Sequence, residues 1–115
     1  LIISVMAGVT TATLSQWLGE HLAIVRAMPN TPAIIQAGMT GLFANSHTLE
    51  EHKTTAEILM RAVGEIIWLT QEKQMDIVTA LSGSGPAYYY FFMECMQTVA
   101  VKMGIPAEVA HLLVS

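Results

Sequence analysis

Residues Thr79–Phe92 read TALSGSGPAYYYFF and divide the chain into two parts of different character. Four small residues, Ser82–Gly85, lie between an amphipathic run that ends at Leu81 and Pro86, which can open a helix. One interpretation is a plain turn between two helices, because glycine is used where the backbone bends sharply. The other is a loop rich in N–H and hydroxyl groups at a helix N-terminus, which favours binding of a carboxylate.

The segment after this loop, Pro86–Met103, predicts a helix that is apolar nearly all round. Its first turns carry the aromatic run Tyr88–Phe92, which supplies large area for burial. Such a helix is either part of the core or buried against a second subunit. Gly104 ends the helix, and Pro106 opens another.

The part of the chain before the loop predicts an α/β fold. Apolar runs at Leu1–Met6 and Ala23–Met28 are strand-like, and Thr10 can cap a helix between them. This helix reaches about Leu18 and is stopped by Gly19. Strand, helix and strand in this order indicate a parallel crossover, which is half of a doubly wound sheet.

Two more strands and a further helix are predicted before the loop. Gly38–Ala44 and Glu65–Thr70 have strand character. Thr48 and Glu51 have the spacing of a capping box, which predicts the start of the helix between those strands. Beyond Glu72 the pattern is wholly helical, so we expect a domain boundary after that residue.

Composition argues against several classes of protein. Of the 115 residues 53% are hydrophobic and 12% are charged, which leaves apolar surface for a partner or for further sequence to cover. A net charge of −4 with five scattered basic residues argues against nucleic-acid binding. Cys95 is the single cysteine, which favours a reducing, cytoplasmic location. The longest apolar stretch, Ala87–Met103, is interrupted by polar residues and is shorter than the roughly 20 residues of a membrane span.

Residues just beyond the predicted strand ends are candidate ligand contacts, because ligands of doubly wound sheets bind beyond the carboxyl ends of the strands. Ala7 and Gly8 follow the first strand. Pro29–Pro32 follows the second, and its two prolines fix the backbone while Asn30 and Thr31 present short polar side chains. A plain rigid turn is the alternative interpretation of this segment.

The sequence predicts neither a metal site nor a catalytic side chain. Only one cysteine is present, and no two of the four histidines are three or four residues apart. The histidines are His21, His47, His52 and His111. No Ser-His-Asp or Cys-His arrangement can be recognised, so the catalytic residues stay unknown.

Motifs along essentially the whole chain resemble those of pyrroline-5-carboxylate reductases, the enzymes of the last step of proline biosynthesis. They are ISVMAGVT at 3–10, RAMPNTPA at 26–33, LSGSGPAY at 81–88 and KMGIP at 102–106. The resemblance implies that residues 1–72 are the C-terminal part of a Rossmann-like NAD(P)-binding domain. It also implies that residues 73–115 are the N-terminal part of a helical dimerisation and substrate domain.

The resemblance further implies reduction of 1-pyrroline-5-carboxylate to L-proline by NADPH or NADH, in a homo-oligomer built from dimers. The residues expected near the nicotinamide are Ala7, Gly8, Pro29, Asn30 and Thr31. The residues expected to bind the substrate carboxylate are Ser82, Gly83, Ser84 and Gly85.

Two parts of the family pattern are absent, namely the G-x-G-x-x-G fingerprint and the segment that completes the substrate pocket. We therefore expect a piece of a longer protein that is inactive alone. One alternative is a related reductase similar to 3-hydroxyacid dehydrogenases. Those enzymes generally use a lysine on the helix after the cofactor domain, whereas no lysine occurs between Lys73 and Lys102. A non-catalytic helical dimerisation module is the other alternative.

Overall fold

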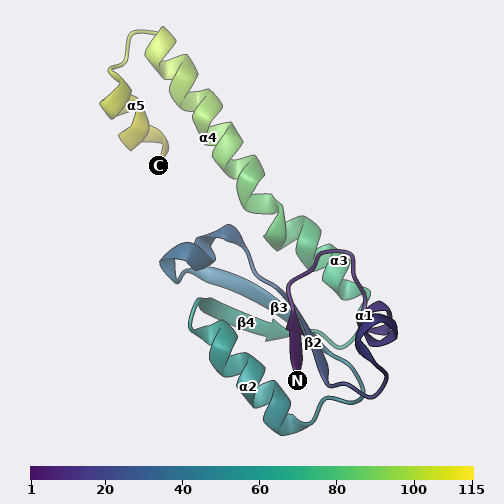
Figure 1. Ribbon diagram of the computed structural model, residues 1–115. Helices are drawn as coiled ribbons and strands as arrows, with labels where there is room; N and C mark the ends of the chain where they lie inside the picture. The colour runs from purple at the N-terminus through teal and green to yellow at the C-terminus, as the bar shows by residue number, and fades with distance from the viewer. The chain divides into compact units, whose positions relative to one another are not determined.

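The computed structural model describes all 115 residues and divides into two compact units, Leu1–Gly83 and Ser84–Ser115 (Figure 1). The first unit combines a sheet with helices, and the second consists of helices alone. This arrangement confirms the predicted fold class, an α/β part followed by an all-α part. The domain boundary expected after Glu72 stays a prediction.

The first unit is built on one four-stranded sheet. Its strands follow the chain order, β1 (Ile2–Ser4), β2 (Ile24–Met28), β3 (Gly38–Ala44) and β4 (Gly64–Trp68). β1 and β2 are parallel, as the crossover predicted, and β3 and β4 are also parallel. β3 runs antiparallel to β2, because the connection between them is too short for a crossover. The carboxyl ends of β1 and β2 therefore lie at the same edge of the sheet as the amino ends of β3 and β4.

Helices cover the two faces of this sheet. Helix α2 (Glu50–Arg61) packs on one face through Ala56, which lies in the buried core cluster with Leu42. Val78 of α3 (Gln74–Val78) lies against Gly41, the neighbour of Leu42 on β3. Because successive residues of a strand point to opposite faces, α2 and α3 cover opposite faces of the sheet (Figure 1).

Helix α1 (Thr11–Leu18) forms where its caps predict it. Thr10 accepts a hydrogen bond from the backbone N–H of Thr13 at 3.1 Å, so it is the N-cap. Gly19 ends the helix with a φ of 122°, a conformation that glycine adopts without steric cost. Both local predictions for this helix are confirmed.

The capping box predicted from Thr48 and Glu51 is wrong, because α2 begins one residue later than expected. Thr48 Oγ1 donates to the backbone oxygen of Ile24 at 3.2 Å and so connects the start of α2 to β2. His52 Nδ1 accepts from the backbone N–H of Leu49 at 3.1 Å. An imidazole therefore takes the back-bonding role that the sequence pattern assigned to a glutamate.

The second unit consists of α4 (Gly85–Lys102) and α5 (Ala107–Val114). The two helices contact each other, and Gln97 Nε2 lies 3.1 Å from His111 Nδ1. The aromatic side chains of Tyr88–Phe92 are exposed by 54–74%. The interpretation of α4 as a core helix of this chain is therefore wrong. Neither α4 nor any other helix has the length and apolarity needed to cross a membrane.

Candidate functional site

The turn after β1 lies beside a cleft. Gly8 has a φ of 73°, in the left-handed region that favours glycine. A Cβ added to Gly8 would meet no atom within 4 Å, so the turn is open on that side. The cleft has a volume of about 350 Å³ and is lined by Gly8, Thr10, Arg26, Glu72, Lys73 and Asp76. The structure thus places the predicted Ala7–Gly8 turn where a ligand can approach the backbone.

The segment after β2 is held in place by hydrogen bonds to both polar atoms of the Asn30 side-chain amide. Asn30 Oδ1 accepts from the backbone N–H of Met39 at 2.9 Å, and Asn30 Nδ2 donates to Ser82 Oγ at 3.2 Å. Thr31 then begins a short 3₁₀ helix, Thr31–Ile35, with a proline in its first turn. The second of these hydrogen bonds therefore joins Asn30, expected near the nicotinamide, to Ser82, expected at the substrate carboxylate.

The Ser-Gly stretch is helical where the sequence predicted an open loop, so that part of the prediction is wrong. Ser82 and Gly83 belong to a π-helical turn, Thr79–Gly83, that closes the first unit. Thr79 Oγ1 donates to the backbone oxygen of Met75 at 2.8 Å and helps to hold the preceding turn. A helical backbone directs its N–H groups along the axis, which leaves the serine hydroxyls as the groups available to a ligand.

Ser84 and Gly85 open the second unit. Ser84 is the N-cap of α4, with φ −89° and ψ −28°, and its side chain makes no capping hydrogen bond. Gly85 is buried and has no positive φ, so its backbone conformation does not by itself require glycine. Pro86 occupies the first turn of α4, as predicted. The N-terminus of an 18-residue helix therefore presents an uncommitted hydroxyl beside a residue without a side chain.

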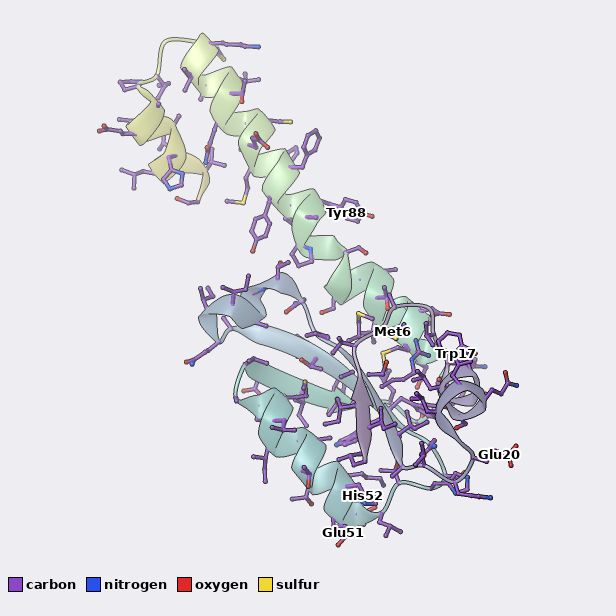
Figure 2. All side chains as sticks on the ribbon, in the orientation of Figure 1. Met6, Trp17, Glu20, Glu51, His52 and Tyr88 are labelled. Carbon is purple, nitrogen blue, oxygen red and sulfur yellow. The ribbon has the colours of Figure 1, made fainter.

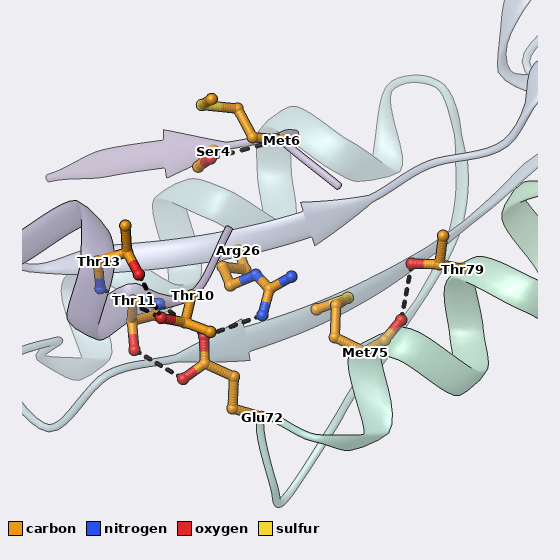
Figure 3. A network of polar contacts seen from close by, with 9 residues as sticks. All are labelled: Ser4, Met6, Thr10, Thr11, Thr13, Arg26, Glu72, Met75 and Thr79. Atoms are coloured by element: carbon orange, nitrogen blue, oxygen red, sulfur yellow. Dashed lines mark hydrogen bonds and ion pairs between the residues drawn. The ribbon is translucent and has the colours of Figure 1, made fainter. Parts of the chain in front are cut away.

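The sequence interpretation missed a buried ion pair of the first unit. Arg26 is 3% exposed, and its Nη1 lies 3.0 Å from Glu72 Oε1 (Figure 3). Glu72 also accepts from Thr11, at 2.6 Å from the backbone nitrogen and 2.9 Å from Oγ1. The sequence signal for this pair was the position of Arg26 within an apolar strand, because a buried charge requires a partner.

One face of α4 is apolar and uncovered. Its residues recur at helical spacing and line a shallow groove of about 420 Å³: Phe92, Cys95, Met96, Val99, Ala100 and Met103. Figure 2 shows Tyr88 projecting from the same helix, with 69% of its surface exposed. Exposed apolar surface of this extent is typical of an interaction site. No group of three or more His, Cys, Asp or Glu side chains is placed to hold a metal ion.

Comparison with known proteins gives one consistent family. Residues 72–115 match the family described as pyrroline-5-carboxylate reductase dimerisation. The chain is 46% identical to pyrroline-5-carboxylate reductase of Haemophilus influenzae over 99% of its own length and 42% of that protein. The reductase structure from Coxiella burnetii matches with a TM-score of 0.87 at 50% identity, over 97% of this chain and 42% of that one. The Plasmodium falciparum pyrroline carboxylate reductase with NADP bound matches with a TM-score of 0.93 at 35% identity, over 99% of this chain and 46% of that one.

Proposed function

Since this chain is homologous to pyrroline-5-carboxylate reductases, we propose that the protein containing it reduces 1-pyrroline-5-carboxylate to L-proline. The similarity covers nearly the whole chain, while the chain spans only 42% of the length of the Haemophilus influenzae relative. The observation that carries the proposal is this similarity in both sequence and fold. The hydrogen bond from Asn30 to Ser82 supports it, because it joins the two segments expected to face cofactor and substrate.

A nicotinamide cofactor, NADPH or NADH, fits the carboxyl ends of β1 and β2. Gly8 leaves its side of the cleft open, and a backbone without a Cβ permits close approach of a ligand. Asn30 is held rigidly by its two hydrogen bonds. We assign the nicotinamide end of the cofactor to Ala7, Gly8, Pro29, Asn30 and Thr31. When bound, the cofactor supplies the hydride, and these residues orient it.

The substrate carboxylate is assigned to Ser82, Gly83, Ser84 and Gly85. Ser82 Oγ accepts the hydrogen bond from Asn30, which leaves its own O–H free to donate to an anion. Ser84 caps no backbone N–H, and it stands at the start of α4, where the helix dipole favours negative charge. The two hydroxyls, rather than a loop of N–H groups, are the expected donors.

We propose that the protein is a homodimer, or a multiple of dimers, that uses the apolar face of α4. This face is exposed in the single chain, and residues 72–115 match a family named for dimerisation. Burial of the apolar groove against its copy removes that surface from water, which is the main favourable contribution to association. We expect the assembled enzyme to act in the cytoplasm.

The proposed function is tested on the complete reading frame that contains these residues. The purified protein is incubated with 1-pyrroline-5-carboxylate and NADPH or NADH, and both nucleotide oxidation and L-proline are measured. We expect oxidation that depends on the substrate and equals the proline formed. Residues 1–115 alone should show no turnover, because the chain has no phosphate-binding glycine turn. Absence of L-proline from the complete protein with both nucleotides would contradict the proposal.

A further inference from the structure

The Arg26–Glu72 ion pair lies beneath the cleft that contains Gly8. Both residues line that cleft, and the arginine is almost fully buried. The Glu72 carboxylate receives donors from two elements, Arg26 on β2 and Thr11 at the start of α1 (Figure 3). The pair therefore connects the sheet to the first turn of α1.

Thr11 is the first residue of α1 after its N-cap, where a helix has backbone N–H groups without an internal partner. Glu72, 61 residues away, takes the N–H of Thr11 at 2.6 Å and its hydroxyl at 2.9 Å. A carboxylate at a helix N-terminus is also favoured by the helix dipole. The start of α1 is thus capped twice, locally by Thr10 and from a distance by Glu72.

Stability alone explains this arrangement poorly. Arg26 Nη2 is buried and has no hydrogen-bond partner, so the pair leaves one donor unsatisfied. Buried ion pairs are often no more stabilising than apolar residues of similar volume. The ion pair provides an oriented hydrogen-bond acceptor for Thr11, which lies three residues after Gly8. A pair of apolar residues could not provide one.

We propose that Arg26 and Glu72 are positioning residues for cofactor binding: the arginine orients the carboxylate, the carboxylate fixes Thr11, and Thr11 fixes the preceding Ala7–Gly8 turn against the cleft. This inference rests on the proposed function, because it assumes that the nicotinamide binds in the cleft beside the Ala7–Gly8 turn. Neither residue touches the reacting atoms in this role. Their effect on catalysis passes through Thr11, which Glu72 holds by both its backbone N–H and its hydroxyl.

One substitution separates this role from the ion pair itself. Thr11→Pro removes both hydrogen bonds from Thr11 to Glu72 and leaves the two charged residues in place. Proline is well tolerated at the first position of a helix. The preceding Thr10 has φ −79° and ψ 160°, an extended conformation that is compatible with a following proline.

The experiment uses the complete protein and measures the dissociation constant of NADPH by fluorescence titration without substrate, with NADH if the wild type prefers it. Both Michaelis constants and the melting temperature are measured alongside. Glu72→Gln and Thr11→Pro are compared with Glu50→Gln, which removes the exposed pair between Glu50 and Lys53. That control should behave as wild type.

We expect Thr11→Pro and Glu72→Gln to raise the nucleotide dissociation constant by about tenfold, the scale of one charge-assisted hydrogen bond. The KM for 1-pyrroline-5-carboxylate should change by less than about threefold. If Thr11→Pro does not fold, Thr11→Val, which removes only the hydroxyl donor, should raise the dissociation constant by about threefold. A folded Thr11→Pro or Thr11→Val protein with the wild-type dissociation constant overturns the inference.

Failure of the proposed function gives a different result. In that case the wild-type protein binds nucleotide but forms no proline. The dissociation constants of the variants then still decide whether Glu72 positions the turn through Thr11. If the wild-type protein binds neither nucleotide, the inference is overturned together with the assignment of the cleft.

Discussion

Asn30 and Ser82 are 52 residues apart in the chain and are joined by a hydrogen bond of 3.2 Å between Asn30 Nδ2 and Ser82 Oγ. One follows β2, and the other lies in the π-helical turn at the end of the first unit. The bond fixes the distance between the segment assigned to the nicotinamide and one of the hydroxyls assigned to the substrate. A hydride donor and acceptor require such a fixed relation, because small misplacements slow the reaction strongly.

Asn30→Ala, Ser82→Ala and the double variant of the complete protein measure this bond. We expect a coupling of about 1 kcal/mol in the free energy of unfolding, the net value of a typical hydrogen bond. Urea unfolding of the four proteins provides the measurement. Asn30→Ala should cost more than Ser82→Ala, because it also removes the acceptor of the Met39 N–H. Single effects that add to within about 0.3 kcal/mol would show that the bond contributes nothing.

The elements that follow from local pattern could be predicted from the sequence. The caps at Thr10 and Gly19 and the strand Gly38–Ala44 agree with the structure because nearest neighbours determine them. The Arg26–Glu72 pair could not be placed in this way, since its partners are 46 residues apart and meet only in the folded sheet. Local pattern gives no information on such pairings.

The Ser-Gly stretch shows a second limit of local pattern. Glycine and serine disfavour helix by intrinsic propensity, so the sequence predicted a loop. In the structure Gly83 lies close to Met28 of β2, where a Cβ would come to 3.5 Å from the sulfur. Packing against the sheet thus holds a helical turn that propensity alone would not form. The prediction failed where tertiary contact overrides local preference.

Gly41→Ala tests how closely α3 packs on the sheet. A Cβ at Gly41 would lie 2.8 Å from Val78 Cγ1, so the Val78 side chain or the helix that carries it must shift. We expect a loss of about 1–3 kcal/mol in the free energy of unfolding, the usual cost of overpacking. Val78→Ala in the same protein should restore part of that loss by removing the obstructing methyl groups. Equal stability of wild type and Gly41→Ala in urea would show that the contact is looser than the structure gives.

The apolar face of α4 predicts a dimer that a single charge can dissociate. Val99→Glu would place a carboxylate in the groove beside Met96, and a buried unpaired charge is costly. We expect the dimer dissociation constant to rise by roughly a hundredfold or more, measured by sedimentation. Gln16→Glu adds the same charge at an exposed position of α1 and should leave the dimer intact. A Val99→Glu dimer as tight as wild type would place the interface elsewhere.

Gly85→Ala separates a structural role of the Ser-Gly stretch from a binding role. Gly85 lies at the first position of α4 without a positive φ, and an added Cβ meets no atom of the chain within 4 Å. Alanine is also the better helix former, by up to about 1 kcal/mol. The substitution should therefore leave the melting temperature of the complete protein unchanged or raise it slightly.

If the start of α4 receives the substrate carboxylate, the same methyl group obstructs the approach of the substrate beside the Ser84 hydroxyl. We expect the KM for 1-pyrroline-5-carboxylate to rise by about tenfold, while the KM for the nicotinamide stays near its wild-type value. Because a Michaelis constant does not depend on the concentration of active enzyme, incomplete folding alone would change neither constant. A stable Gly85→Ala enzyme with both Michaelis constants and kcat at wild-type values would contradict the assignment of Gly85 to the substrate site, because an added methyl group there would then not affect substrate binding.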